Sequence, residues 1–335
     1  MPMQSKNICK RKDCSLEGSF IKENCFRNIT EKWFLSIAPQ IKESTKNKYL
    51  NLLNSYILPE LGTLPLDELT HSKVESMCNS LLLNGGKRKL GLSPKTVTDA
   101  LSVVRNIIKY ASQHGVYIPC EAQNIHIKRP SKEMRVLTLN EQSILYNYLY
   151  SNPTGHNMGI LVCLFTGLRI GEICALRWED ISFRDQTIYI HHTMQRIQKA
   201  SEQGKKTQIV ITPPKSASSI RTIPIPDDLL KMLHQYKTTE TGYFLTNSEL
   251  TFMEPRILQY RFKRVLEILR IAPANYHTLR HTFATRCVEL EFDIKSLSEI
   301  LGHASVNITM NRYVHPSLEL KKKNMQRLST LLSIK

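Results

Sequence analysis

Four polar side chains near the carboxyl end of the chain have the types and spacing needed to cut a phosphodiester. The stretches YHTLRHTFATR and LGHASVNITMNRYVH place His277, Arg280, His303 and Tyr313 within fewer than forty residues. A tyrosine hydroxyl can attack phosphorus only if neighbouring donors spread the charge that develops on the phosphate oxygens. Arginine does this with a planar fork of N–H groups, and histidine donates a further hydrogen bond or moves a proton. The four side chains therefore suit cleavage through a phosphotyrosine.

The spacing of the first two side chains predicts a helix that presents them together. His277 and Arg280 stand three residues apart, so they would share one face of that helix. An opposing apolar stripe would bury the helix; it consists of Leu279, Phe283, Cys287 and Leu290. His281 falls beside the reactive edge, and we interpret it as structural. Farther along, Gly302 permits a tight turn directly before His303.

The order of these motifs resembles that of the tyrosine recombinases, the family of phage and conjugative-element integrases. The H-x-x-R motif begins at His277, the L-G-H motif ends at His303, and Tyr313 stands at the family's nucleophile position. Upstream, FTGLRIGEICALRWEDI matches the family's first arginine box, with the catalytic arginine at Arg169. PKSASSIRTIPI matches the segment that carries the catalytic lysine, here Lys215. Each box alone is weak, but four boxes in this order make the resemblance specific.

The resemblance implies a division of labour among these side chains. The two arginines would hold the scissile phosphate, His303 would donate a further hydrogen bond to it, and Tyr313 would attack it. His277 would help to accept the tyrosine proton or fix a phosphate oxygen. Lys215, in a turn between strands, would protonate the leaving 5′ oxygen. The competing candidates for that role, in the same hairpin region, are Lys205 and Lys206.

Glu172 is expected to support this site. It stands three residues after Arg169 and would orient that arginine or a histidine. The competing interpretation is a carboxylate that complements the dipole of its own helix. Because arginines supply the positive charge, and no carboxylate cluster or phosphate-binding loop is evident, the sequence predicts neither a metal nor a cofactor.

The elements that carry these residues predict an α+β protein, mainly α-helical, with two domains. Apolar residues recur at helical spacing through residues 26–118, which resemble the family's helical core-binding (SAM-like) DNA-binding domain. Residues 119–132 read as a linker, and residues 133–335 as the catalytic domain, ending in a tail helix. Thr138 or Asn140 would cap the first helix of that domain. Alternation in QTIYIH, TQIVIT and IRTIPI predicts a small three-stranded antiparallel sheet.

The charge of the chain predicts a polyanionic partner. Lys and Arg number 46 against 29 Asp and Glu, a net charge of +17, so counterion release from nucleic acid would drive binding. Charge alone leaves a ribosomal or membrane-surface protein open. Lys87, Arg88 and Lys89 are candidate phosphate contacts, or simply an exposed basic loop. The resemblance implies double-stranded DNA with specific core sites, a homotetramer on two synapsed duplexes and an accessory DNA-bending protein.

The first 25 residues form a polar basic tail whose cysteines, Cys9, Cys14 and Cys25, raise the alternative of a zinc site. No CxxC pair is present and the nearest histidine is His71, so a fourth ligand is missing and reduced thiols are favoured. No stretch approaches the roughly 18 apolar residues of a membrane span, and no signal peptide is evident. We therefore expect a cytoplasmic protein, associated with the nucleoid when bound to DNA.

The leading functional hypothesis is a site-specific integrase that integrates and excises a mobile element through a 3′-phosphotyrosyl intermediate. A chromosome-dimer resolvase of the same family is one alternative. A type IB topoisomerase-like nicking-closing enzyme is another, and it would relax supercoils without pairing two sites. The last alternative is a catalytically silent DNA-binding protein, which the presence of all six catalytic side chains argues against.

Overall fold

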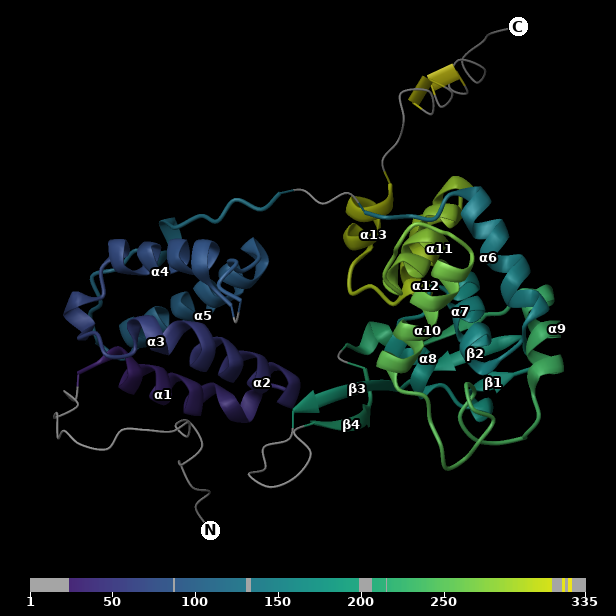
Figure 1. The fold of residues 1–335 in the computed structure, drawn as a ribbon, viewed down its shortest axis with the longest axis horizontal. Helices are drawn as coiled ribbons and strands as arrows, with labels where there is room; N and C mark the ends of the chain where they lie inside the picture. The colour runs from purple at the N-terminus through teal and green to yellow at the C-terminus, as the bar shows by residue number, and fades with distance from the viewer. Residues whose placement is uncertain are drawn as a thin grey trace, which may run out of the picture. The chain divides into compact units, whose positions relative to one another are not determined.

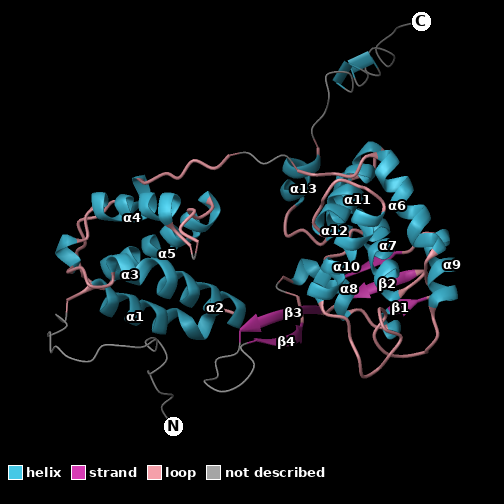
Figure 2. Cartoon of the chain, in the orientation of Figure 1, coloured by secondary structure: helices cyan, strands magenta, loops and turns pink. Residues whose placement is uncertain are grey.

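The fold is seen in a computed structural model, which describes residues 24–86, 88–130, 134–198, 207–214, 216–314, 321–322 and 325–326. The chain divides into two compact units, with the main division at residue 132. Helices make up most of each unit, and the strands are short (Figures 1 and 2). The prediction of a mainly α-helical α+β protein is therefore confirmed. The predicted tail helix lies largely outside the described residues.

The first unit is a small bundle of helices. They are α1 (Phe26–Ile37), α2 (Glu43–Leu52), α3 (Leu58–Leu61), α4 (His71–Asn84) and α5 (Pro94–Gln113). A π-helical turn at Leu53–Ile57 joins α2 to α3 without a break. Ser93 caps the start of α5, because its hydroxyl accepts a hydrogen bond from the Thr96 amide at 3.2 Å. Its apolar residues at helical spacing are buried and form much of the core of the bundle: Val97, Leu101, Val104 and Ile107.

The segment predicted as a linker begins inside this bundle. Arg105 of α5 donates hydrogen bonds to the carbonyl oxygens of Ala122, at 2.9 Å, and Ile125, at 2.6 Å. Both of those residues are buried in the core. The guanidinium group thus provides hydrogen-bond donors for carbonyl oxygens that lie outside any long helix or strand. The predicted linker packs against the bundle as far as Ile127, and Arg129 donates a hydrogen bond to the hydroxyl of Thr98 in α5.

The second unit is built around one apolar helix. Its helices are α6 (Leu139–Ser151), α7 (Gly155–Thr166), α8 (Ile170–Ala175), α9 (Asp227–Tyr236), α10 (Pro255–Ile268), α11 (His277–Glu289), α12 (Ile294–Leu301) and α13 (Val306–Tyr313). Every residue of α7 from Asn157 to Leu164 is buried, and α6, α10 and α11 pack against this helix. Thr138, rather than Asn140, caps α6: its hydroxyl accepts from the Glu141 amide, and the Glu141 carboxylate accepts from the Thr138 amide.

Two small antiparallel sheets accompany these helices. Strands β1 (Ile181–Ser182), β2 (Thr187–Ile190) and β5 (Arg221–Pro224) form one, in the order β1-β2-β5. Strands β3 (Thr193–Gln198) and β4 (Thr207–Thr212) form the other. The expectation that TQIVIT belongs to the three-stranded sheet is therefore wrong. Alternation specifies a strand but not its partner, and β4 buries neither face fully, whereas β2 and β5 bury alternate residues.

The described cysteines are unpaired and buried: Cys25, Cys78, Cys120, Cys163, Cys174 and Cys287. Cys9 and Cys14 lie outside the described residues. In the part of the chain that the structure describes, no three His, Cys, Asp or Glu side chains gather closely enough to hold a metal ion. Within that same part, every helix is too short or too polar to cross a membrane.

Candidate active site

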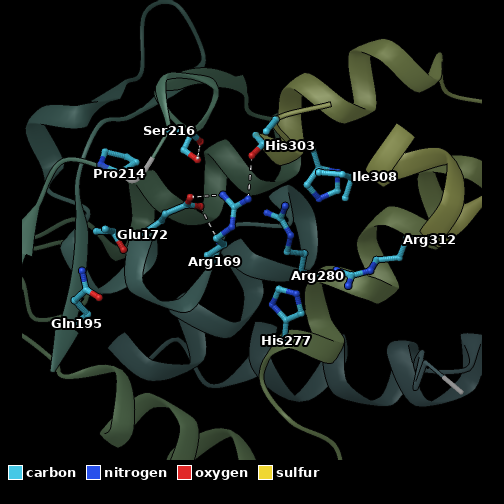
Figure 3. A pocket seen from close by; sticks show the side chains of 14 residues that line it. Arg169, Glu172, Gln195, Pro214, Ser216, His277, Arg280, His303, Ile308 and Arg312 are labelled. Atoms are coloured by element: carbon cyan, nitrogen blue, oxygen red, sulfur yellow. Dashed lines mark hydrogen bonds and ion pairs between the residues drawn. The ribbon is translucent and has the colours of Figure 1, made fainter. Parts of the chain in front are cut away.

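A cavity of about 490 Å³ in the second unit gathers most of the predicted catalytic side chains. Its walls come from segments far apart in the sequence: the start of α8, strand β3, the described residues on either side of position 215, α11, and the region from the end of α12 into α13. Figure 3 shows the side chains that face this common space, among them Arg169, His277, Arg280 and His303. Lys215 lies outside the described residues, whereas its neighbours Pro214 and Ser216 line the cavity.

Arg169 reaches the cavity because α7 stops just before it. Gly167 adopts the left-handed conformation with φ of 65° and ends α7, so the chain turns and Arg169 becomes the residue that precedes α8. Its guanidinium group donates from Nη1 to Glu172 Oε1 at 2.8 Å and from Nη2 to the carbonyl oxygen of Gly302 at 2.9 Å. These two bonds fix its direction and leave further N–H groups for a ligand.

Glu172 joins Arg169 to a second, buried arginine. Its carboxylate accepts from Arg221 Nη1 at 3.1 Å and Nη2 at 2.9 Å, and also from the Arg169 amide at 2.9 Å. Burial alone would raise the pKa of this carboxyl, but Arg221 and Arg169 outweigh it and hold the pKa below its ordinary value. Glu172 is only 3% exposed, so it acts as an internal counter-ion that orients Arg169. The hydrogen bond from the Arg169 backbone N–H also satisfies a donor at the start of α8. The arrangement is therefore compatible with both interpretations of Glu172, the support of Arg169 and the stabilisation of its own helix.

Arg280 is buried in the floor of the cavity, with 1% of its surface exposed. It donates from Nη1 to the carbonyl oxygen of Gly167 at 2.8 Å and from Nη2 to that of Leu301 at 2.7 Å. Burial and the charge of Arg169 lower its pKa to about 9, so the group remains charged at neutral pH. Two neighbouring guanidinium groups repel each other here, and an anion between them would relieve that repulsion.

Three consecutive carbonyl oxygens at the end of α12 hold three different arginines. Those of Ile300, Leu301 and Gly302 accept from Arg221 at 2.6 Å, Arg280 at 2.7 Å and Arg169 at 2.9 Å, respectively. Carbonyls in the last turn of a helix lack partners within the helix, so cationic side chains can satisfy them. The arginines come from β5, from α11 and from the residue before α8. One helix end thus sets the spacing of the positive charges.

Two histidines complete the walls of the cavity, and both are neutral at pH 7. Surrounding protein, and then the charge of Arg280 and its neighbours, lower the pKa of His303 to about 3. Surrounding protein, and then the neighbouring His281 ring and the charge of Arg280, lower the pKa of His277 to about 4. The Nδ1 atom of His303 lies 2.7 Å from the hydroxyl of Thr309, which leaves Nε2 for a second partner.

Tyr313 ends α13 beside this cavity. The residue is 6% exposed, and its ring lies parallel to that of His303, with 6.4 Å between the centroids. Its hydroxyl oxygen lies 2.9 Å from Nδ1 of His281. Burial raises the pKa of the phenol, whereas Arg280 and Arg312 oppose that rise. The interpretation of His281 as structural does not account for this contact with the predicted nucleophile.

Four residues that the structure places in the site are assigned no part in it from the sequence alone: Arg221, His281, Thr309 and Arg312. The segment that matches the lysine box contains Arg221, and its pairing opposite Ile190 puts it on the buried face of the sheet. His281 follows His277 by four residues, so its position on the same helical face was a readable signal. No local pattern marks Thr309.

Two further predictions concern the buried face of α11 and the basic residues that follow α4. Leu290 is 71% exposed, so its inclusion in the buried stripe of α11 is wrong; the helix ends at Glu289, and Leu290 falls beyond its regular turns. Arg88 and Lys89 are exposed in the loop between α4 and α5, while Lys87 lies outside the described residues. Their contact with phosphate stays a prediction.

Substituting Gly302 with alanine is expected to weaken both the fold and the site. Its φ of 64° disfavours any side chain, and an added Cβ would lie 3.0 to 3.1 Å from atoms of Arg221. The side chain of Arg221 cannot move aside easily, because it donates hydrogen bonds to the carbonyl oxygen of Ile300 and to the carboxylate of Glu172. We expect a loss of about 1–3 kcal/mol in the free energy of unfolding, measured by urea denaturation.

Gly115→Ala is the matched control for that substitution. Gly115 has a φ of 73°, but an added Cβ there would meet nothing within 4 Å. It therefore isolates the backbone cost from the steric one. Equal losses for both variants would contradict a steric role for the contact with Arg221.

The sequence matches two family descriptions. Residues 135–319 match "Phage integrase family", and residues 25–82 match "Phage integrase, N-terminal SAM-like domain". The first match covers more than half of the chain and contains every residue of the cavity.

Similar proteins carry integrase and recombinase names. A "Tyrosine recombinase XerC-like" protein of Caldanaerobacter subterraneus subsp. tengcongensis is 26% identical over 315 residues, which covers 87% of this chain and 78% of the relative. The integrase of Staphylococcus phage L54a is 24% identical over 358 residues, which covers 96% of this chain and 98% of the relative.

Solved structures show the same fold. The Tn1549 transposon integrase in complex with transposon right end DNA matches with a TM-score of 0.73 and 20% identity, over 90% of this chain and 99% of that chain. A lambda integrase tetramer bound to a Holliday junction matches with a TM-score of 0.62 and 18% identity, over 89% and 82%. Together with the family match, these findings show that the chain belongs to the phage integrase family and is a tyrosine recombinase.

Proposed function

We propose that this tyrosine recombinase is the integrase of a mobile element, which cuts and rejoins DNA at specific sites through a 3′-phosphotyrosyl intermediate. The observation that carries the proposal is the cavity in which Arg169, Arg280, His277 and His303 converge beside the hydroxyl of Tyr313. Among the described residues that line the cavity, positive side chains outnumber the one carboxylate, Glu172, which two arginines already bind. It therefore suits an anion of phosphate size.

In the proposed reaction the arginines bind the non-bridging oxygens of the scissile phosphate. Arg280 is held in place by two carbonyl oxygens, and Arg169 by one carbonyl and Glu172, so neither has to reorganise when charge develops. His303 and His277 are neutral and can each donate a hydrogen bond to the same phosphate. Removal of one such donor costs roughly 3 to 4 kcal/mol of transition-state stabilisation in comparable sites.

Tyr313 is the proposed nucleophile. Its attack yields a 3′-phosphotyrosyl bond and a departing 5′ oxygen, which Lys215 would protonate, with Lys205 and Lys206 as the alternatives. The phosphotyrosyl bond conserves the energy of the phosphodiester, so rejoining needs no ATP. Attack on that bond by a 5′ hydroxyl from a second duplex gives strand exchange.

Double-stranded DNA is the proposed partner, and the net charge of +17 supports it. The first unit, whose residues 25–82 match the SAM-like domain, would contribute the exposed Arg88 and Lys89, and the neighbouring Lys87, to phosphate binding. The lambda integrase structure supports a homotetramer on two synapsed duplexes, with an accessory DNA-bending protein as a further expectation.

Two relatives favour different biological roles. The phage L54a integrase aligns over nearly the whole of both chains, which supports the mobile-element proposal. The XerC-like relative has slightly higher identity and favours a chromosome-dimer resolvase as the second candidate. The two roles share the chemistry of the cavity and differ only in the DNA that is recombined.

The test uses the full chain and DNA from both flanks of its own gene. Incubation followed by SDS should trap a covalent protein–DNA adduct on a flanking fragment, and plasmids carrying two copies of that fragment should recombine. Adducts on the host's chromosome-dimer resolution site alone would favour the resolvase, and relaxation of supercoils without recombination would favour a nicking-closing enzyme. Binding without any adduct would overturn the proposal.

A further inference from the structure

Two histidines one helical turn apart on α11 face different parts of the site. His277 lines the cavity, whereas His281 places its Nδ1 atom 2.9 Å from the hydroxyl oxygen of Tyr313. The two imidazole rings stand nearly perpendicular, with 4.6 Å between their centroids. The helix therefore directs one histidine toward the place of the phosphate and the other toward the nucleophile.

We propose that His281 is the general base that takes the proton from Tyr313 during attack, and that His277 serves the phosphate instead. This inference rests on the proposed function, because it concerns the same cleavage step. It differs from the expectation that His281 is structural. Of the two roles expected of His277, accepting the tyrosine proton or fixing a phosphate oxygen, it keeps the second.

The environment of His281 keeps its ring ready to accept a proton. Burial, and then the charges of Arg312 and Arg280, lower its pKa to about 4, so the ring is neutral near pH 7. Its Nδ1 atom, 2.9 Å from the hydroxyl oxygen, accepts the tyrosine O–H when the ring proton is on Nε2, and the proposal requires that tautomer. The same two arginines stabilise the negative charge that grows on the phenol oxygen.

The other histidine beside Tyr313 is less suited to this role. The ring of His303 lies parallel to that of Tyr313, and this stacked arrangement does not direct a ring nitrogen toward the tyrosine hydroxyl. Its Nδ1 atom is already paired with Thr309. Among the histidines of the described part of the chain, His281 is the one whose nitrogen is hydrogen-bonded to the Tyr313 hydroxyl.

The step balances without any further reactant. The O–H bond of Tyr313 breaks and its proton forms a new N–H bond on Nδ1 of His281, while the phenol oxygen forms a bond to phosphorus. The bond from phosphorus to the 5′ oxygen breaks, and that oxygen takes a proton from a general acid, for which Lys215 is proposed. In rejoining, protonated His281 returns its proton to the departing tyrosinate.

The first experiment compares His281→Asn with His277→Asn on a nicked duplex that traps the adduct, built from the flanking fragment. Asparagine can keep a hydrogen bond near the Nδ1 position but cannot take up a proton. We expect His281→Asn to bind this DNA normally and to form the adduct about 10²–10⁴-fold more slowly. Adduct formation at the wild-type rate would overturn the inference.

The second experiment separates a base from a residue that only supports the site. In a Tyr313→Phe background, a DNA strand ending in a 3′-p-nitrophenyl phosphate is joined to a 5′-hydroxyl strand. The p-nitrophenolate ion is a far weaker base than tyrosinate and leaves without being protonated. Adding His281→Asn should therefore change this joining rate less than threefold, whereas adding His277→Asn should slow it at least tenfold.

The outcomes of the two experiments can be told apart. If His281→Asn slows the joining of the p-nitrophenyl strand as much as it slows cleavage, the residue only supports the site and the inference falls. If the two histidine variants behave alike in both assays, the division between them falls. If the wild-type chain itself forms no adduct, the proposed function fails first, and this inference fails with it.

Discussion

Replacing Tyr313 with phenylalanine should abolish covalent attachment to DNA while leaving DNA binding and the fold intact. The change removes one oxygen atom, and the hydrogen bond to His281 is lost with it. A reaction that loses its nucleophile should slow by a factor on the order of 10⁴ or more. The SDS-resistant protein–DNA band measures this directly, and fluorescence anisotropy with the same fragment measures binding.

Tyr276→Phe is the matched control, because it also removes one tyrosine oxygen from the second unit. The hydroxyl of Tyr276 is buried and donates to the carbonyl oxygen of Gly159 at 2.7 Å. Phenylalanine there would remove this buried hydrogen bond, at a cost of about 0.5–1.5 kcal/mol in the free energy of unfolding. This variant should therefore melt at a lower temperature and still form the adduct below that temperature. An adduct that persists in Tyr313→Phe would mean that another residue is the nucleophile.

Replacing Glu172 with alanine should cost about 3–5 kcal/mol in the free energy of unfolding. The substitution leaves Arg221, whose side chain is 6% exposed, without its buried counter-ion, and it frees Arg169 from one of its two anchors. Adduct formation should fall as well, because Arg169 loses its fixed direction. Urea denaturation and the adduct assay measure the two effects separately.

An exposed ion pair provides the comparison for that loss. Glu289 pairs with Arg286 at 2.5 Å, and its side chain is 52% exposed. Glu289→Ala should cost less than about 1 kcal/mol, because Glu289 is half exposed and Arg286 keeps its hydrogen bonds to Gln142 and to the carbonyl oxygen of Leu137. Equal losses for Glu172→Ala and Glu289→Ala would show that burial gives Glu172 no special weight.

The same carboxylate should also set part of the acid sensitivity of the fold. Burial would raise the pKa of Glu172, but Arg221 and Arg169 lower it below the ordinary value of 4.5. A carboxyl whose pKa is lower in the folded state stabilises the protein above its unfolded pKa, and that stabilisation is lost as pH falls through the folded pKa. Stability of the wild-type chain should thus fall more steeply below pH 4.5 than that of Glu172→Gln. The same dependence of unfolding free energy on pH below 4.5 in both proteins would contradict this.

The sequence was sufficient for the side chains whose roles depend on local spacing. His277 and Arg280 stand three apart, which puts both on one helical face, and Gly302 precedes His303 in the left-handed conformation that ends α12. Long-range pairing could not be read in the same way. The position of Arg221 opposite Ile190, and the pairing of β4 with β3 rather than with the other sheet, depend on segments that alternation does not connect.

The role of His281 illustrates a different limit. Its spacing from His277 was visible, but only the packing of α13 against α11 decides which of the two histidines meets Tyr313. Identical side chains one turn apart look equivalent in a sequence. Their difference comes from a neighbour that lies 32 residues farther along the chain.

The three consecutive carbonyl groups at the end of α12 couple the positions of the arginines in the candidate active site. Three arginines from three elements are anchored to Ile300, Leu301 and Gly302, so a shift of this one helix end would misalign all three together. The next helix, α13, carries Tyr313 and packs on α12. A displacement of α13 would therefore move Tyr313, the proposed nucleophile, and the three arginines together.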